Sequence, residues 1–155
     1  MKFDKYVKMV GTMGVIASYQ GKKYLCAGSM VVRIPEGING LVCAATVQLP
    51  EGFRRVLDDG QGEPAELVDA FLPYANGKSS EVRRVFADKE LHRVHISNKH
   101  FGLIERHDDL ALICCMIDGE LMPVALRVYN EHNEERDAYI FAQEYLERLG
   151  MYMEV

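Results

Sequence analysis

The stretch Arg-His-Asp-Asp-Leu-Ala-Leu-Ile at residues 106–113 decides the fold class, because a charged corner here runs directly into an apolar segment. The apolar residues begin at Leu110 and continue through Met116, which predicts a loop that leads into a strand inside a core. Such a corner can hold a carboxylate at a site, so Asp108 and Asp109 are candidate binding residues. An ordinary turn and strand start is the simpler interpretation of an isolated Asp-Asp pair.

The composition is typical of one folded domain that spans residues 1–155. The chain is 48% hydrophobic and 26% charged, and it contains no Gly, Pro or Ser tract that would mark a linker. Its net charge of −5 disfavours nucleic acid as a partner, since affinity for nucleic acid depends mainly on Lys and Arg that neutralise phosphates. Residues 1–10 contain three lysines, and no later apolar run reaches membrane-spanning length. We therefore expect neither a signal peptide nor a membrane segment.

The cysteines also bear on the cellular compartment. Cys26, Cys43, Cys114 and Cys115 lack the spacing of metal ligands, and the side chains of two adjacent residues in a strand point to opposite faces. We interpret all four as small buried hydrophobic side chains. The lack of a signal peptide and of a disulfide framework predicts a reducing, cytoplasmic compartment.

Strand-like segments follow one another along the first part of the chain. A hairpin is predicted between residues 7–19 and 24–32, and residues 41–47 are predicted to form a third antiparallel strand. Residues 50–64 are polar and rich in Gly, and they are expected to form an exposed loop.

A second hairpin is predicted around Asn-Gly at residues 76–77, between strands at 66–74 and 80–86. A short helix over residues 64–72 is the competing interpretation, because its apolar residues also have helical spacing. Two further strands are predicted at 110–117 and 122–128, joined by an Asp-Gly turn.

The end of the chain changes to a period of 3.6 residues. Over residues 133–149 the apolar side chains share one face and the charged ones lie largely opposite. Asn133 suits the N-cap, and Gly150 suits a left-handed end. This pattern predicts an α-helix over residues 133–149.

Histidines gather in the segment before residue 110. His92, His95, His100 and His107 lack the closely placed pair of helical zinc motifs, and no fourth ligand is evident. We interpret them as solvated loop histidines and expect no metal and no cofactor.

Residues 26–31 are Cys-Ala-Gly-Ser-Met-Val, residues 41–47 are Leu-Val-Cys-Ala-Ala-Thr-Val, and residues 107–113 are His-Asp-Asp-Leu-Ala-Leu-Ile. In this order they resemble the Cys-Gly-Gly-Ser-Leu-Ile strand, the Leu-Thr-Ala-Ala-His-Cys strand and the Asn-Asp-Ile-Ala-Leu-Leu segment of chymotrypsin-like serine proteases, the superfamily of trypsin and the high-temperature-requirement proteases. Residues 122–126 resemble the Pro-rich stretch that follows in that family. The resemblance covers about residues 10–128.

This resemblance implies a mainly β fold, a single six-stranded antiparallel Greek-key barrel like the N-terminal half of such a protease, over about residues 7–128. In the family a C-terminal helix packs against the first barrel, and the helix predicted over 133–149 would be its counterpart. The second barrel would be missing.

The departures from the family pattern decide what the resemblance implies for activity. Thr46 stands at the position of the catalytic histidine, and its hydroxyl is no general base near neutral pH. Asp109 alone matches a triad residue, no Gly-Asp-Ser-Gly nucleophile segment is present, and Val47 replaces the cysteine that would pair with Cys26. The resemblance thus implies a protein without Ser-His-Asp catalysis.

We therefore expect a non-catalytic, protease-like module, a pseudoprotease that acts by protein binding or self-association. A lone barrel exposes the face that the second barrel normally covers, and exposed apolar faces commonly mark interaction sites. Thr46, Asp108 and Asp109 are expected near this face. The expected partner is a second copy of the chain or another protein.

The alternative function is a hydrolase that uses residues outside the matched positions. Cys114 or Cys115 would be the nucleophile and His95 or His107 the nearby base, or a second chain would complete the site. Catalytic thiols need an accessible setting that favours the thiolate, whereas both cysteines lie in a predicted core strand.

Overall fold

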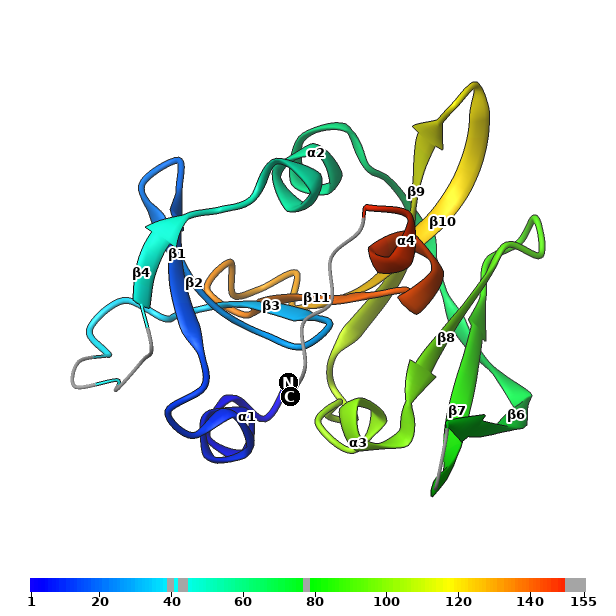
Figure 1. The fold of residues 1–155 in the computed structure, drawn as a ribbon, viewed down its shortest axis with the longest axis horizontal. Coiled ribbons are helices and arrows are strands. Elements are labelled where there is room, and N and C mark those ends of the chain that lie inside the picture. Colours follow the sequence, from blue (N-terminus) through cyan, green and yellow to red (C-terminus); the bar gives the residue numbers. More distant parts are fainter. Residues whose placement is uncertain (39–40, 42–44, 77–78, 150–155) are drawn as a thin grey trace.

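The computed structural model describes residues 1–38, 41, 45–76 and 79–149, with the backbone alone described at 45–46, 69–76 and 79–82. The fold is mainly β, as expected, with two sheets side by side (Figure 1). The larger sheet has eight strands, in the order β4 (Ala45–Gln48), β1 (Val15–Tyr19), β2 (Lys22–Ala27), β3 (Met30–Arg33), β11 (Asp137–Phe141), β10 (Glu120–Tyr129), β9 (Asp109–Ile117) and β5 (Gln61–Pro64).

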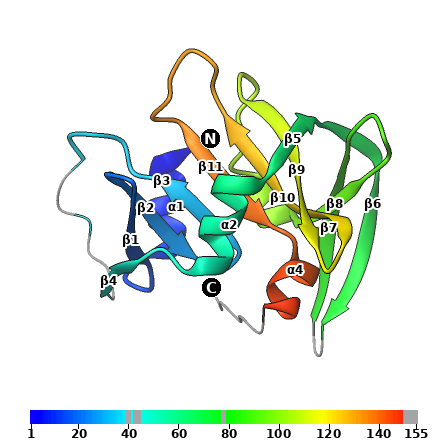
Figure 2. The ribbon, with the colours of Figure 1, turned by 90° about the horizontal axis from the view of Figure 1, so that it is seen from above.

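The smaller sheet has three antiparallel strands, β6 (Glu66–Asn76), β7 (Ser79–Ala87) and β8 (Arg93–Ser97). It lies beside the end of the larger sheet that contains β9 and β10 (Figure 2). Four helices complete the described part of the chain: α1 (Phe3–Val10), α2 (Glu51–Asp59), α3 (Asn98–Phe101) and α4 (Gln143–Arg148). None of these helices is both long and apolar enough to cross a membrane.

The larger sheet is not the closed six-stranded barrel that we expected. It has eight strands, and in the described residues β4 and β5 lie at its two ends without pairing to each other. β4 also pairs parallel with β1, Thr46 opposite Ile16, and so it is not the third antiparallel strand that was predicted. The adjacent residues 42–44 lie outside the described part of the chain.

The segment that resembled a single protease strand is in fact a tight hairpin. β2 ends at Ala27 and β3 begins at Met30, and these two residues are paired. Gly28 has φ = 58°, a left-handed conformation that glycine adopts without the steric cost of a Cβ atom. The expected hairpin of β1 and β2 is confirmed, but residues 3–10 before it form α1 and not a strand.

Two other segments also differ from the expectation. Residues 50–64 contain α2 and β5, because Phe53 and Val56 of α2 are one turn apart and bury one face of an otherwise polar helix. The helix predicted over 133–149 is restricted to α4, and the residues before it form β11. β11 lies between β3 and β10 and is buried continuously from Ala138, so its apolar run has no alternation that would have distinguished it from a helix.

The remaining strand predictions are confirmed. β6 and β7 form the expected hairpin in preference to a helix, although Gly77 of its turn lies outside the described residues. β9 and β10 pair antiparallel through a turn in which Asp118 and Gly119 both have positive φ, 51° and 83°. These are the dihedral angles of a two-residue hairpin turn.

Aromatic side chains join the helices to the centre of the sheet. The ring centroids of Phe53 and Phe141 are 4.6 Å apart. The ring of Tyr145 in α4 stacks on Phe141, with 6.2 Å between the centroids. The Tyr145 hydroxyl donates a 2.8 Å hydrogen bond to the Gly52 carbonyl. α2, β11 and α4 therefore share one aromatic core.

Phe53→Ala is expected to lower the free energy of unfolding by about 3–5 kcal/mol, because it leaves a cavity between α2 and β11. Urea unfolding followed by circular dichroism measures this change. Met13→Ala is the control: Met13 is 71% exposed, and truncation of such a side chain changes stability by less than about 0.5 kcal/mol. Equal stability of the two variants would contradict the packing of α2 in the core.

Candidate metal site

The carboxylate of Asp88 organises the turn between β7 and β8. Its Oδ1 accepts hydrogen bonds from the backbone N–H groups of Glu90 and His92, at 3.0 and 2.9 Å. Its Oδ2 lies 2.9 Å from Nδ1 of the His92 ring. The backbone closes the same turn, since the Asp88 N–H donates to the His92 carbonyl at 3.2 Å. The orientation of the His92 ring is therefore fixed by a buried carboxylate.

The turn contains a strained residue. Leu91 has φ = 66°, a left-handed conformation that is uncommon for a bulky side chain and costs roughly 1–2 kcal/mol. Its side chain is 71% exposed, so its own packing offsets little of this cost. The hydrogen bonds to Asp88 on both sides hold the conformation in place. Strained backbone of this kind tends to occur at functional sites.

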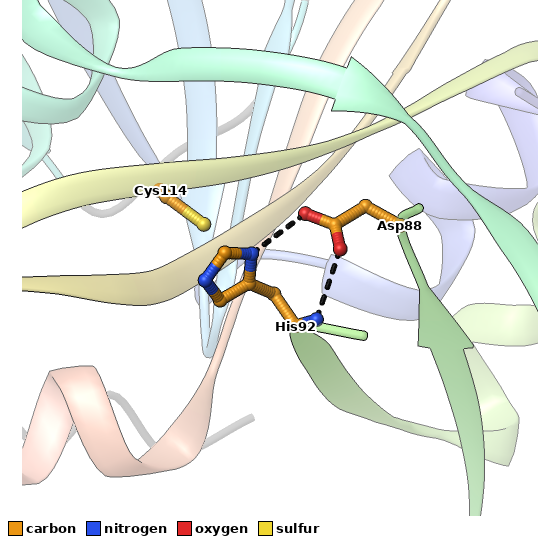
Figure 3. A group of neighbouring side chains, drawn as sticks. All are labelled: Asp88, His92 and Cys114. Atoms are coloured by element: carbon orange, nitrogen blue, oxygen red, sulfur yellow. Dashed lines mark hydrogen bonds and ion pairs between the residues drawn. The ribbon is translucent and has the colours of Figure 1, made fainter. Parts of the chain in front are cut away.

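Cys114 reaches the same point from the other sheet. It lies on β9, between β10 and β5, and its side chain is buried. One oxygen of Asp88, one ring nitrogen of His92 and Sγ of Cys114 all lie within 4.8 Å of one another. Figure 3 shows the thiol directed at the histidine ring, with the carboxylate beyond it. Three different kinds of metal ligand, from a turn and a distant strand, thus converge at one place.

Further carboxylates surround this cluster. Glu90 Oε2 is 3.9 Å from His92 Nδ1, and the Glu90 side chain is 75% exposed. Burial, and after it the negative charges of Asp88, Glu90 and Glu63 together with the Cys115 thiol, raise the pKa of the Cys114 thiol to about 11. The thiol is therefore protonated at neutral pH.

The pKa of Asp88 shifts in the opposite direction to that of Cys114. Burial opposes its ionisation, but the hydrogen bonds from the ring and backbone of His92 and from Glu90 outweigh burial and lower its pKa below the usual value. The cluster thus holds a permanent negative charge next to a neutral thiol. A cation at this point would be attracted by the carboxylates and would favour the thiolate.

The structure does not bring the sequence-predicted site residues together at one site. Thr46 lies on β4, whereas Asp109 is the first residue of β9. Five strands separate β4 from β9 in the sheet order. The Asp109 carboxylate accepts a hydrogen bond from the Glu131 N–H at 3.1 Å. The side chain of Asp108 is 1% exposed, and its carboxylate accepts hydrogen bonds from the Glu105 N–H, at 2.7 Å, and from the Met1 amino group. Both carboxylates hold loops in place, which agrees with the interpretation as a turn and strand start.

The histidines are not uniformly solvated loop residues, as had been predicted. His95 lies in β8, His100 is 9% exposed within α3, and His92 is half-buried beside Cys114, whereas His107 is exposed. The alternative hypothesis paired Cys114 with His95 or His107, but the histidine near it is His92. Sequence reasoning missed this site. An Asp-Xaa-Glu-Xaa-His pattern at 88–92 was the local signal, but nothing in the sequence connected it to a strand 22 residues further on.

The cysteine interpretation is confirmed for three residues. Cys26, Cys114 and Cys115 are buried free thiols, and Cys43 lies outside the described residues.

Comparison of the chain with protein-family models, with curated proteins and with solved structures found no match. The resemblance to chymotrypsin-like proteases therefore stays a prediction, and the argument for function comes from the geometry of the site.

Asp88→Asn is expected to lower the free energy of unfolding at pH 7 by about 1–3 kcal/mol, because a neutral amide accepts the two backbone N–H groups more weakly than the buried carboxylate does and has an NH2 group in place of the oxygen that faces His92. The pKa of Asp88 is lower in the folded state than in the unfolded chain. The contribution of ionised Asp88 to the free energy of unfolding is therefore complete above its pKa in the unfolded chain, about 4. It is lost as the pH falls through its pKa in the folded state.

The measurement is urea unfolding of the wild type and the variant at neutral pH and at about pH 2, each without added metal. The difference between the two proteins should be large at pH 7 and small in acid. Asp59→Asn, at an exposed carboxylate of α2, is the control and should change little at either pH. A difference that does not depend on pH would contradict this role of Asp88.

Proposed function

We propose that the chain binds a divalent transition metal ion of the Zn²⁺ class, with Asp88, His92 and Cys114 as ligands and Glu90 as the fourth. The observation that carries this proposal is the approach of a carboxylate oxygen, an imidazole nitrogen and a thiol sulfur to within 4.8 Å of one another. These three groups are the donors that zinc sites in proteins use.

The donor set favours zinc over other common cations. Ca²⁺ and Mg²⁺ take oxygen ligands, so a thiol and an imidazole argue against them. Zinc ligands lie about 2.0–2.3 Å from the ion, which separates neighbouring donor atoms by roughly 3–4 Å. The Asp88 and His92 donors are 2.9 Å apart, so modest side-chain rotation is enough to admit an ion between them.

The charges of the site also favour a cation. The carboxylates that raise the pKa of the Cys114 thiol would stabilise a bound metal, and a coordinated thiol loses its proton. Binding should release a proton and weaken in acid. The alternative, Cys114 as a nucleophile without a metal, is disfavoured because reactive cysteines need a lowered pKa and this one is raised to about 11.

The role of the ion is structural in this proposal. Four protein ligands leave no open position for a substrate, as is typical of structural zinc sites. The ion would connect the β7–β8 turn of the smaller sheet to β9 of the larger sheet, two elements that are distant in the sequence (Figure 3). It would also stabilise the strained turn around Leu91.

Co²⁺ tests the proposal, because it takes zinc sites and absorbs visible light, which d¹⁰ Zn²⁺ does not. The wild type is expected to show d–d bands of a tetrahedral site and a thiolate charge-transfer band. Cys114→Ser should abolish the charge-transfer band, and His92→Gln should weaken the binding of Co²⁺ by about ten-fold or more. Zn²⁺ at about 100 times its Kd should raise the free energy of unfolding of the wild type by roughly 2.7 kcal/mol.

Cys115→Ser provides a matched control. Cys115 is the next residue of the same strand and is as buried as Cys114, but it is not in the cluster. Its variant should keep the charge-transfer band. The proposal fails if the wild type shows no thiolate band at millimolar Co²⁺, or if both cysteine variants behave alike.

A second proposal keeps the protease-like binding module, with a second copy of the chain as the partner. The order β1-β2-β3-β11-β10-β9 supports it, because β9, β10 and β11 are consecutive antiparallel strands and β3 lies beside the last of them, as in a Greek key. β4 is the end strand of the described sheet, and Val47 on it is 43% exposed. An end strand with exposed apolar residues favours pairing with another strand.

Val47→Lys tests this second proposal, since a lysine on an end strand opposes sheet-to-sheet pairing. Light scattering across a concentration series should give a dimer for the wild type and a monomer for the variant. Leu67→Lys, at a comparably exposed residue of β6 in the other sheet, should remain dimeric. A wild type that is monomeric at all concentrations would contradict self-association.

A further inference from the structure

A cavity of about 170 Å³ lies between the two sheets, and Asp88, His92 and Cys114 are not among its described lining residues. Its walls come from the β2–β3 turn, from β8 and α3, and from the end of β11. A cavity of about 10–15 Å³ already holds one water molecule, so this one has room for a small ligand. Its polar lining residues include Ser29, Arg83, His95, Ser97, Lys99 and His100.

The charge of this lining is unusual for the chain. Arg83 and Lys99 are cations and two histidines join them, whereas no Asp or Glu is among the described residues that line the cavity. The whole chain has 23 acidic residues against 18 Lys and Arg. The described part of the lining therefore differs from the average surface of the chain, and basic groups around a cavity create a positive potential there.

The strand register explains how these groups share one wall. Side chains alternate along β8, so His95 and Ser97 point to one face while Val94 and Ile96 point into the core. Arg83 of β7 is paired with Ser97, which places both on the same face. The positions of these groups are thus set by backbone pairing and not by flexible loops.

A hydroxyl group and an imidazole ring also meet in the lining of the cavity. The Ser29 hydroxyl and His100 Nδ1 are 3.3 Å apart, and His100 is 9% exposed. Ser29 follows Gly28 in the tight turn between β2 and β3, and its carbonyl accepts the Phe141 N–H at 2.7 Å. The turn is therefore anchored to β11, and the Ser29 hydroxyl is held at the cavity wall.

The positive wall continues into a second, smaller cavity of about 60 Å³. Both cavities are lined by Arg83, His95 and Gln143, and the smaller one adds Arg93. Glu144 also lines the smaller cavity, so its charge is mixed. The strongest positive character therefore belongs to the larger cavity, around Lys99.

We propose that the larger cavity binds the phosphate group of a small phosphate monoester. A phosphate dianion accepts hydrogen bonds from several donors at once, and charged donors make the strongest of these bonds. Lys99 and the Ser29 hydroxyl supply such donors, and the guanidinium of Arg83, which also has an interaction of its own, lies in the same wall. Met9 is half-buried and lines the same cavity, so its side chain offers apolar surface to the organic part of the ester, while Ile140 and Phe141 lie behind it in the core.

Phenyl phosphate is the probe, because it combines a phosphate group with a small apolar body. Two-dimensional ¹H–¹⁵N NMR in the presence of EDTA, which removes any metal, should show saturable shifts of the amide signals of residues 28–29 and 96–100. Inorganic phosphate should compete at the same signals. Phenol, which lacks the phosphate, should not reproduce these shifts.

Lys99→Gln is expected to weaken the binding of phenyl phosphate by about ten-fold, since one charge-assisted hydrogen bond is lost. Ser29→Ala should weaken it by a smaller factor. Lys22→Gln makes the same change of charge at an exposed lysine outside the lining residues and should bind as the wild type does. Thermal unfolding of each variant verifies that it is folded.

The inference is overturned if the wild type gives no saturable shifts up to tens of millimolar phenyl phosphate. It is also overturned if folded Lys99→Gln and Lys22→Gln bind equally, or if phenol competes as well as inorganic phosphate does. Because EDTA is present throughout, these outcomes are independent of metal binding at Asp88, His92 and Cys114.

Discussion

The hydrogen bonding of β11 between β3 and β10 is the constraint on which the rest of the structure depends. β3 belongs to the first strands of the chain and β10 to the hairpin with β9, and β11 joins these two groups into one sheet. Its last residue, Phe141, contacts α2 and α4 and fixes the Ser29 turn. Without β11, the aromatic core and the wall of the cavity beside Ser29 would both lose their support.

The second organising interaction is local, at Asp88. A single buried carboxylate there accepts two backbone N–H groups and orients an imidazole ring. These bonds explain why Leu91 can adopt a left-handed conformation that a leucine otherwise avoids. Burial keeps the thiol of Cys114 neutral, and the charges of this carboxylate and of Glu90 act in the same direction. One group thus provides turn stability and the negative charge that a metal ion would neutralise.

Sequence reasoning identified the hairpins but not their assembly, and the difference has a physical cause. Turns such as Asp118-Gly119 depend on local dihedral preferences, so the β9–β10 hairpin was predictable. The identity of β11 depended on burial between two other strands, which removed its alternation and left a pattern that also fits a helix. The approach of the Cys114 sulfur to within 4.8 Å of a His92 ring nitrogen depends on how the two sheets pack together. No local conformational preference determines this packing.

Composition says little about local sites, because a net charge describes the whole chain and a ligand responds to the charges within a few ångströms. At physiological salt the screening length is about 8 Å, so a group in a cavity is governed by its own walls. His92, just before β8, lies beside the carboxylates of Asp88 and Glu90. His95, further along the same strand, lines a cavity together with Arg83. A net charge of −5 is therefore compatible with the two proposals, a cation at Asp88 and an anion beside Lys99. The net charge argues against a long phosphate backbone as partner, but it does not argue against a single phosphate group.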